Sequence, residues 1–512
     1  MFGLFHQFRG DNLKARCARS SFVLGIGAVI AKGLAFGSKV ILARLLVPQE
    51  LGLMVMILSL TQFFEVLTEI GIKQSVIQHK NGAEPQYLNM AWWFQGLRAI
   101  GLYVVAFTLA PLLCEFYFRS RPEVLIRYSM EELITLVRVA FLSILFNGFV
   151  SPRAHVLEKK FRFGRAVVIT QGGFVLGAIV TIILAFAIRN VWAIVIGFAA
   201  TGFTRCLMSY VLCPFIPRFA YHRESFQGLY RFARGMLGLP VLTYIAFNID
   251  VLVAGKLVST SLVGLYGMAL TLAFAPWDLF SRIISPVLFP AFVEKQDDKE
   301  GLSKAVLKIT RVTGLFLIAP AVLAIICSKA ILTFVFGAEY SAVGVPFGLL
   351  CVYVVLLIQS TVFATVLLGI GQPGKHRAFV GVRALILVVF IYPAIKLFGL
   401  TGAAAVVMLA SLLALCLQVF VLRKVIGLRI FDYIISWVPG VVAALPVLAI
   451  VVFMQYVRAD DPVLHLSIGA FVSVVFCLGG FFFLEGSAKV SRRAAGKPTI
   501  VEPEGKIEVE NV

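Results

Sequence analysis

The sequence predicts an all-α, polytopic membrane protein that crosses the bilayer about fourteen times. Of its 512 residues, 60% are hydrophobic and 14% are charged, and the mean hydropathy is +0.95. A soluble chain usually carries about 25% charged residues. The hydrophobic residues form repeated runs of about 20, the length at which an α-helix crosses the hydrocarbon core. Membrane-spanning strands would alternate in polarity, and these runs do not.

The expected spans can be placed in order along the chain. Residues 1–20 are polar and basic, which favours a cytoplasmic lead-in that lies on the membrane surface. The first apolar run is too long for the core of a cleavable signal peptide. Prolines 276, 286 and 290 are expected to kink or end the eighth span. The spans lie near residues 21–43, 51–71, 91–113, 133–150, 166–188, 191–213, 232–254, 262–290, 309–327, 343–370, 378–397, 399–422, 434–456 and 464–484.

An internal repeat divides the chain into two like halves. Residues 250–258 align with residues 39–47, and Gly264 then aligns with Gly52 once the turn gains one residue. We therefore expect two pseudo-symmetric six-helix lobes followed by two extra helices. The expected divisions are an N-lobe over 21–230, a C-lobe over 231–430, two helices over 431–485 and a disordered cytoplasmic tail over 486–512.

The basic residues favour one orientation of these spans. The formal net charge is +20, and Lys and Arg concentrate in alternate loops, which the positive-inside rule assigns to the cytoplasm. Both termini are then cytoplasmic. No motif for binding nucleic acid is present. The largest basic cluster comprises Arg153, Lys159, Lys160, Arg162 and Arg165.

Signatures of catalysis and of metal binding are missing. The chain has no G-x-x-x-x-G-K-[ST], no H-E-x-x-H and no G-x-S-x-G motif. Its six histidines do not cluster, and its eight cysteines include no C-x-x-C pair. The loops are also short for an enzyme that polymerises glycans. We expect a protein that is not an enzyme, with no metal site and no cofactor.

Charges inside the apolar runs are the remaining candidates for function. Six positive and four negative residues lie there, and an excess of buried cations needs an anion to compensate it. Glu65 and Glu69 stand one turn apart on one face, and Asp278 and Arg282 have the spacing of an ion pair. The cations are Lys32, Lys39, Arg98, Arg205, Arg282 and Arg383, and the anions are Glu65, Glu69, Asp250 and Asp278.

Each charge also has a structural alternative. Arg98, Arg205 and Arg383 lie toward the cytoplasmic ends of their spans, where long side chains snorkel to the headgroups. Glu65 and Glu69 are as well explained by structural pairing as by function. The hypothesis nevertheless assigns substrate binding to Lys32, Lys39, Arg98 and Arg282, and ion coupling or gating to Glu65, Glu69, Asn248, Asp250 and Asp278. Lys39 and Asp250 align in the repeat and are expected to form a pair that closes an outer gate.

Three segments carry a resemblance to a known family. A-R-L-L-V-P-Q-E-L-G-L, E-V-L-T-E-I-G-I-K-Q-S-V-I-Q and N-I-D-V-L-V-A-G-K-L resemble the Wzx-type polysaccharide transporters of the MOP superfamily, over most of residues 20–485. The resemblance implies a bacterial inner-membrane flippase whose two lobes form a V. The implied substrate is an undecaprenyl-diphosphate-linked oligosaccharide for exopolysaccharide, O-antigen or capsule synthesis. Candidate partners are a polymerase and a chain-length regulator, and candidate coupling ions are Na⁺ and H⁺.

For such a substrate, Lys32 with help from Arg282 is predicted to hold the diphosphate. Lys32 is in the middle of the first span and has no acidic residue within four positions. Alternative interpretations are a peptidoglycan-precursor flippase or another exporter of the superfamily. An integral-membrane glycan ligase or polymerase, and a structural scaffold, are the alternatives from other classes of protein.

Overall fold

A computed structural model describes residues 33–67, 69, 71–159, 163–218, 221–236, 238–456 and 467–480. In this part of the chain every regular element is a helix, which confirms the all-α prediction. The helices are residues 33–45, α3 (Pro48–Leu67), α4 (Ile72–Gln78), α5 (Pro85–Phe118), α6 (Pro122–Leu125), α7 (Met130–Gly148), α8 (Arg153–Lys159), α9 (Phe163–Ile188), α10 (Val191–Leu212), α11 (Arg223–Met236), α12 (Leu239–Leu257), α13 (Thr260–Leu279), η1 (Phe280–Ile284), α14 (Ser285–Glu294), α15 (Lys299–Ile326), α16 (Ser328–Val335), η2 (Ala338–Val343), α17 (Gly344–Gly369), α18 (Pro373–Ile426), α19 (Ile430–Ile435), α20 (Val438–Tyr456) and Ser467–Gly480.

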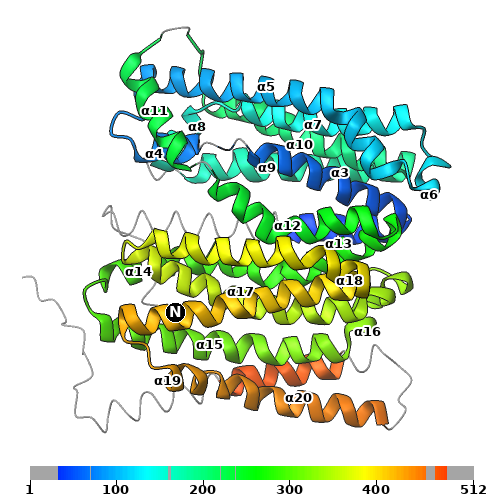
Figure 1. The fold of residues 1–512 in the computed structure, drawn as a ribbon, viewed down its shortest axis with the longest axis vertical. Coiled ribbons are helices and arrows are strands. Elements are labelled where there is room, and N and C mark those ends of the chain that lie inside the picture. The colour runs from blue at the N-terminus through cyan, green and yellow to red at the C-terminus, as the bar shows by residue number, and fades with distance from the viewer. Residues whose placement is uncertain are drawn as a thin grey trace, which may run out of the picture.

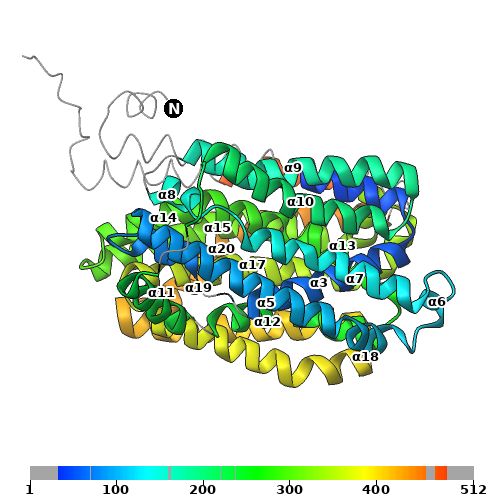
Figure 2. The ribbon, with the colours of Figure 1, turned by 90° about the horizontal axis from the view of Figure 1, so that it is seen from above.

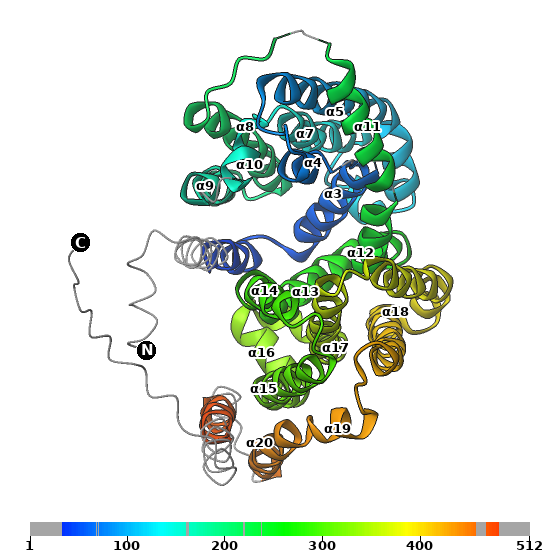
Figure 3. The same ribbon diagram turned by 90° about the vertical axis from the view of Figure 1, so that its left-hand side faces the viewer.

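The long helices form two bundles with their axes roughly parallel (Figure 1). The N-lobe contains α3, α5, α7, α9 and α10, and the C-lobe contains α12, α13, α15, α17 and α18 (Figure 3). Helix α20 packs on α15 at the outer side of the C-lobe. The contact between the lobes is made mainly by α3 with α13 and α12. The two bundles are the two halves that the repeat predicted.

The two ends of the bundle differ in the short helices that they carry (Figures 1 and 2). Helices α4, α8, α11 and α14 gather at one end, here named the α11 end. Helix α6 marks the opposite end, here named the α6 end, where α3 and α13 begin. The orientation predicted from the basic residues would place the α11 end in the cytoplasm.

Ten helices of the described residues are long and apolar enough to span a membrane, or eleven if α7 and α8, bent by 59°, form one span. The chain is therefore a multi-pass membrane protein. Helix α18 accounts for two of the predicted spans, because its 54 residues break at Gly399, where φ is 59°. The predicted first span and last span extend into residues outside the described ranges.

The eighth predicted span is broken, as its prolines indicated. Helix α13 contains Pro276 near its end, and the π-helical segment η1 follows it. Helix α14 then has one proline in its first turn and Pro290 in its interior. Proline removes a backbone donor and displaces the preceding turn, so this chain segment cannot continue as one straight α-helix.

Two glycines at equivalent positions of the repeat hold the lobes together at the α6 end. A Cβ atom on Gly52 would overlap the backbone of Thr260, and a Cβ atom on Gly264 would overlap Pro48 and Gly52. The contact is reciprocal, as expected where like surfaces meet across a pseudo-two-fold axis. Glycine is needed here because the backbones of α3 and α13 approach closer than any side chain allows.

The helix over residues 33–45 lies against the C-lobe along its described length. Lys39 donates from Nζ to Thr271 Oγ1 at 3.0 Å, and Arg44 donates to the backbone oxygens of Phe334 and Val335 in α16. The ring of Phe36 is also near Phe336. The first span, which the sequence groups with the N-lobe, thus makes these contacts to the other lobe.

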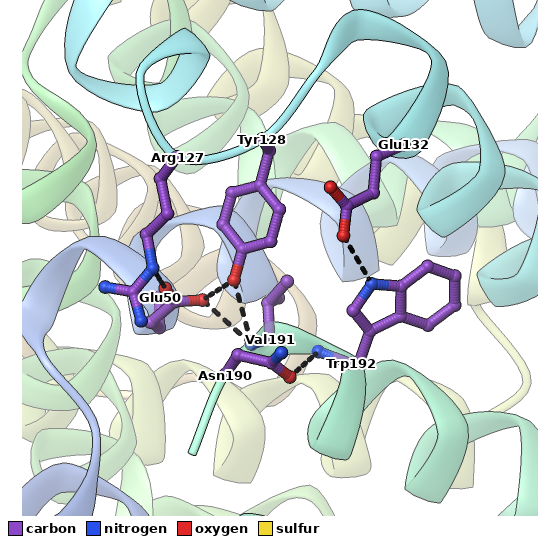
Figure 4. Close-up of polar contacts among 7 residues, drawn as sticks. All are labelled: Glu50, Arg127, Tyr128, Glu132, Asn190, Val191 and Trp192. Atoms are coloured by element: carbon purple, nitrogen blue, oxygen red, sulfur yellow. Dashed lines mark hydrogen bonds and ion pairs between the residues drawn. The ribbon is translucent and has the colours of Figure 1, made fainter. Parts of the chain in front are cut away.

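A buried carboxylate fixes the α6 end of the N-lobe (Figure 4). Glu50, in the first turn of α3, is 1% exposed and accepts from Tyr128 Oη at 2.7 Å and from the backbone N–H of Val191 at 2.8 Å. Arg127 pairs with its other oxygen at 2.8 Å. Burial, together with the bond to Glu50, raises the pKa of Tyr128, so this hydroxyl stays a donor at physiological pH. The network joins α3 to the start of α7 and of α10.

Candidate functional site

A cavity of about 960 Å³ lies between the lobes. It is lined by the helix over residues 33–45, the end of α3, the first half of α12 and the second half of α13. The lining residues of α3, α12 and α13 all come from the halves nearer the α11 end. The cavity therefore belongs to the α11 half of the molecule, while the glycine contact closes the α6 half.

The wall of this central cavity is largely apolar and aromatic, with a few polar groups. Phe36, Phe247, Phe274 and Trp277 contribute rings. Its polar members include four of the predicted site residues, Lys39, Glu69, Asn248 and Asp278. Such a mixture suits a ligand that has both an apolar part and a polar headgroup.

The partners of the predicted residues differ along this wall. Lys39 is exposed and donates to Thr271, and the side chain of Asn248 donates to the backbone oxygen of Tyr244 at 3.4 Å. Arg282 Nε lies 3.9 Å from Asp278 Oδ1, which confirms the pairing expected from their spacing. Arg282 itself extends from η1 beyond the residues that line the cavity.

A second, smaller cavity of about 290 Å³ opens inside the N-lobe at its α11 end. Glu65 lines it with two guanidinium groups, those of Arg98 on α5 and Arg205 on α10, and accepts from Asn147 Nδ2 at 3.3 Å. Gln95 and His155 complete much of the polar wall. Three residues, Val66, Glu69 and Gln74, line both cavities, so the two cavities adjoin at these residues.

Arg205 is the residue that sequence reasoning missed. Snorkelling was one expectation for it, but its Nε is buried in this N-lobe pocket. No local motif marks Arg205, because it meets Glu65 only through the packing of α10 against α3 and α7.

The pocket also shows that the intramembrane cations do not share one cavity. Among the described residues of the central wall, Lys39 is the one cation beside two carboxylates.

Asp250 and Arg383 lie outside both cavities. Asp250 is 3% exposed and accepts from Tyr266 Oη at 2.8 Å. Arg383 donates to the backbone oxygen of Ala246 at 2.6 Å and to the hydroxyl of Tyr353. Because Arg383 is 8% exposed and bonded inside the bundle, the snorkelling expected for it is wrong. In this structure Lys39 and Asp250 bond to Thr271 and Tyr266 and do not form the expected gate pair.

Lys32, the predicted centre of diphosphate binding, lies outside the described residues. The helix that follows it begins at residue 33, and Gly33 lines the central cavity. Its assignment therefore stays a prediction.

Comparison with known proteins matches residues 41–344 to the family described as "Polysaccharide biosynthesis protein". The "Succinoglycan biosynthesis transport protein ExoT" of Rhizobium meliloti (strain 1021) is 26% identical over 348 residues, 66% of each chain. The "Lipopolysaccharide biosynthesis protein WzxC" of Escherichia coli (strain K12) is 26% identical over 424 residues, 81% of this chain and 82% of the relative. An "Uncharacterized membrane protein in cps region" of Klebsiella pneumoniae is 24% identical over 482 residues, which are 92% of this chain and 95% of the Klebsiella chain.

Solved structures share the fold. "Lipid II flippase MurJ, inward closed conformation" superposes with a TM-score of 0.74 at 13% identity, over 93% of this chain and all of that one. An "Inward-facing conformation of a multidrug resistance MATE family transporter of the MOP superfamily" gives 0.56 at 16% identity, over 80% of this chain and 98% of the other. At these identities the likeness shows the two-lobed architecture and nothing further.

Proposed function

Because the chain belongs to the polysaccharide biosynthesis protein family, we propose that it moves undecaprenyl-diphosphate-linked oligosaccharides across the bacterial inner membrane. The curated relatives include a succinoglycan biosynthesis transport protein and a lipopolysaccharide biosynthesis protein. The products would be repeat units for exopolysaccharide, O-antigen or capsule. The protein would act as a transporter and not as an enzyme.

The observation that carries the proposal is the central cavity of about 960 Å³, placed between two lobes and closed at one end. A diphosphate with attached sugars cannot enter hydrocarbon without losing its hydration, which costs many kcal/mol. A cavity that presents Lys39 and polar side chains replaces part of that hydration, and its aromatic wall accommodates the first part of the lipid.

The position of the cavity fits a loading state. If the α11 end faces the cytoplasm, as the basic loops predict, the cavity is placed to receive substrate from the cytoplasmic leaflet. Rocking of the two lobes about the α3–α13 contact would then close the α11 half and open the α6 half. Lys32 is proposed as a further diphosphate contact beside Lys39, with Arg282 as its helper.

The N-lobe pocket is the proposed site of coupling to an ion gradient. Glu65 lines this pocket together with Arg98 and Arg205, and Glu69 lines both this pocket and the central cavity. A change in the charge of Glu65, through H⁺ or through Na⁺, would alter how strongly the two arginines are held. Asp250 is less suited to coupling because it is buried against Tyr266, away from both cavities.

The test is transport by the purified protein in liposomes that contain undecaprenyl-diphosphate oligosaccharide with a fluorescent sugar. A membrane-impermeant quencher reports how much lipid has changed leaflet, with and without ATP and with an imposed H⁺ or Na⁺ gradient. We expect flipping without ATP, stimulated by one of the gradients. Parallel vesicles with lipid II distinguish the alternative substrate.

Two outcomes would overturn the proposal. Flipping that depends on added ATP would contradict a gradient-driven transporter. Transport of lipid II at a rate that exceeds every oligosaccharide carrier tested would replace the proposed substrate with a peptidoglycan precursor. Liposomes with heat-inactivated protein supply the background rate.

A further inference from the structure

The end of α5 is bonded to the end of α12 across the boundary between the lobes. Tyr117 donates from Oη to the backbone oxygen of Leu252 at 3.4 Å, and Lys256 donates to the backbone oxygen of Phe116. Arg121, in the turn between α5 and α6, also donates to the C-lobe. These residues and their acceptors are named here the α5–α12 clasp.

Arg121 is the buried centre of the clasp. It is 5% exposed, and its guanidinium donates to Gly255 O at 2.6 Å, to Val258 O at 2.6 Å and to Thr260 Oγ1 at 2.7 Å. All three acceptors belong to the C-lobe. Glu123, 3.8 Å away, is its acidic neighbour on the N-lobe side.

The acceptors explain why an arginine is suited to this position. Helix α12 ends at Leu257, so the oxygens of Gly255 and Val258 belong to the terminal group that lacks partners within the helix. This end of a helix carries partial negative charge and favours a cation. The planar guanidinium reaches several acceptors at once, which a lysine ammonium cannot match in geometry.

Separation of the lobes at the α6 end must break these bonds together. The donor is on the N-lobe and the three acceptors are on the C-lobe, so moving the lobes apart at this point breaks all three bonds. A buried guanidinium is tolerated only while its donors are satisfied. The bonds therefore stabilise the state in which the α6 half is closed and the central cavity belongs to the α11 half.

We propose that Arg121 is a positioning residue for transport. Its bonds to the α12 terminus and Thr260 hold the two lobes together at the α6 end, here named the α6 gate, while the cavity is accessible from the α11 end. This inference rests on the proposed transport cycle for its purpose, but the closed gate itself can be tested without any substrate. Opening would release Arg121 to solvent and leave the α12 terminus to be solvated by water.

The test measures distances between spin labels in full-length protein in nanodiscs, with the native cysteines replaced. One label pair spans the lobes at the α6 end, at Ile126, which is 87% exposed, and at Lys329. The other spans them at the α11 end, at the exposed residues Lys80 and Lys295. For Arg121→Gln we expect the ratio of open to closed α6 ends to rise about tenfold or more, the effect of losing at least one charge-assisted hydrogen bond. Distances at the α11 end should shorten in parallel.

Matched variants distinguish the effect of losing the clasp bonds from a general effect of charge or of folding. Arg119→Gln removes the same charge two residues away, where the exposed arginine pairs with Glu115 of the N-lobe, and should leave both distances unchanged. Thr260→Val removes one acceptor and should shift the ratio in the same direction by less. Arg121→Lys should restore part of the closed population.

Two results would overturn the proposal. Unchanged distances in both Arg121→Gln and Thr260→Val would show that the clasp does not hold the gate. An equal shift in Arg119→Gln would assign the effect to surface charge. Flipping of lipid-linked oligosaccharide is measured separately on the same samples, so a failed substrate assignment cannot be mistaken for a failed gate.

Discussion

Three carboxylates of this chain have different partners and therefore different expected roles. Glu50 accepts from two donors and pairs with Arg127, and these contacts inside the N-lobe favour a structural role. Asp250 is bonded to Tyr266 inside the bundle. Glu65 lines a pocket with two guanidinium groups and the amide of Asn147, and this pocket adjoins the central cavity. Only a charge that a ligand or ion can reach is able to change its partners during a transport cycle.

The first prediction concerns the balance of charge around Glu65. Arg205→Gln should lower the Tm of the purified protein, because the partly buried carboxylate of Glu65 then loses one of its nearby cations. Glu65→Gln should also lower it, since the two arginines then lose their common anion. The double variant should recover part of the loss, with a coupling free energy of about 1–2 kcal/mol.

Thermal unfolding in detergent, followed by tryptophan fluorescence, measures this coupling. The exposed pair of Glu115 and Arg119 is the control, and its removal should change Tm little because exposed ion pairs contribute about 0–1 kcal/mol. Strictly additive losses for Glu65 and Arg205 would show that they are not electrostatically coupled.

The second prediction concerns Lys39 in the central cavity. Lys39→Ala should reduce flipping about tenfold with little change in Tm, because the exposed ammonium contributes a charge-assisted contact to phosphate more than to folding. Lys39→Arg should retain part of the rate. Lys304→Ala, at an exposed lysine paired with Glu300, supplies the control. A normal rate for Lys39→Ala would remove Lys39 from the substrate site.

At the level of elements, the close approach of the α3 and α13 backbones depends on two glycines. Each glycine faces the backbone at the start of the helix that is equivalent to its own. Backbone cannot yield as a flexible side chain does, so the contact tolerates no added atom. The same two helix starts lie next to the clasp, since Thr260 is both the neighbour of Gly52 and an acceptor for Arg121.

The third prediction follows from this contact. Gly264→Ala should prevent the close approach of α3 and α13 and increase the population with an open α6 end, measured with the same spin-label pair. Gly381→Ala is the matched control, because nothing lies within 4 Å of a Cβ at that helical position. Alanine there should stabilise the helix by about 0.5–1 kcal/mol. A closed α6 end in Gly264→Ala would show that the glycine contact is not required.

At the level of the whole molecule, the two ends are distinguished by composition and by shape. Residues around α8 and α11 carry basic clusters, whereas the α6 end carries the glycine contact between α3 and α13. The proposed cycle needs the α11 end in the cytoplasm, where lipid-linked oligosaccharides with a diphosphate are assembled in the proposed pathway. The orientation of the protein in the membrane is thus part of the functional hypothesis.

The fourth prediction tests that orientation. In a cysteine-free background, Ile126→Cys should react with a membrane-impermeant maleimide in intact cells, because residue 126 is exposed at the α6 end. Tyr221→Cys, 67% exposed at the α11 end, should react only after permeabilisation. A reagent that penetrates both membranes verifies that each site is reactive. The reverse pattern would invert the topology and place the cavity on the periplasmic side.

The sequence by itself determined the helical membrane architecture, the two halves and the broken eighth span. These follow from local properties: the length of apolar runs, the recurrence of residues 39–47 at 250–258, and the restricted backbone of proline. The pairing of Asp278 with Arg282 was predictable for the same reason, since helix geometry sets the distance between positions four residues apart.

Only the tertiary structure decided which distant charges meet. Arg205 lies 140 positions from Glu65 along the chain, and Arg383 is bonded at Ala246 on another helix, so their partners depend on how helices rotate and pack. Arg121 appears in the sequence as one more basic loop residue, yet its guanidinium bonds the opposite lobe. Hydropathy reports how deep a residue lies in the membrane, whereas the direction that it faces is fixed by contacts between helices that are far apart in sequence.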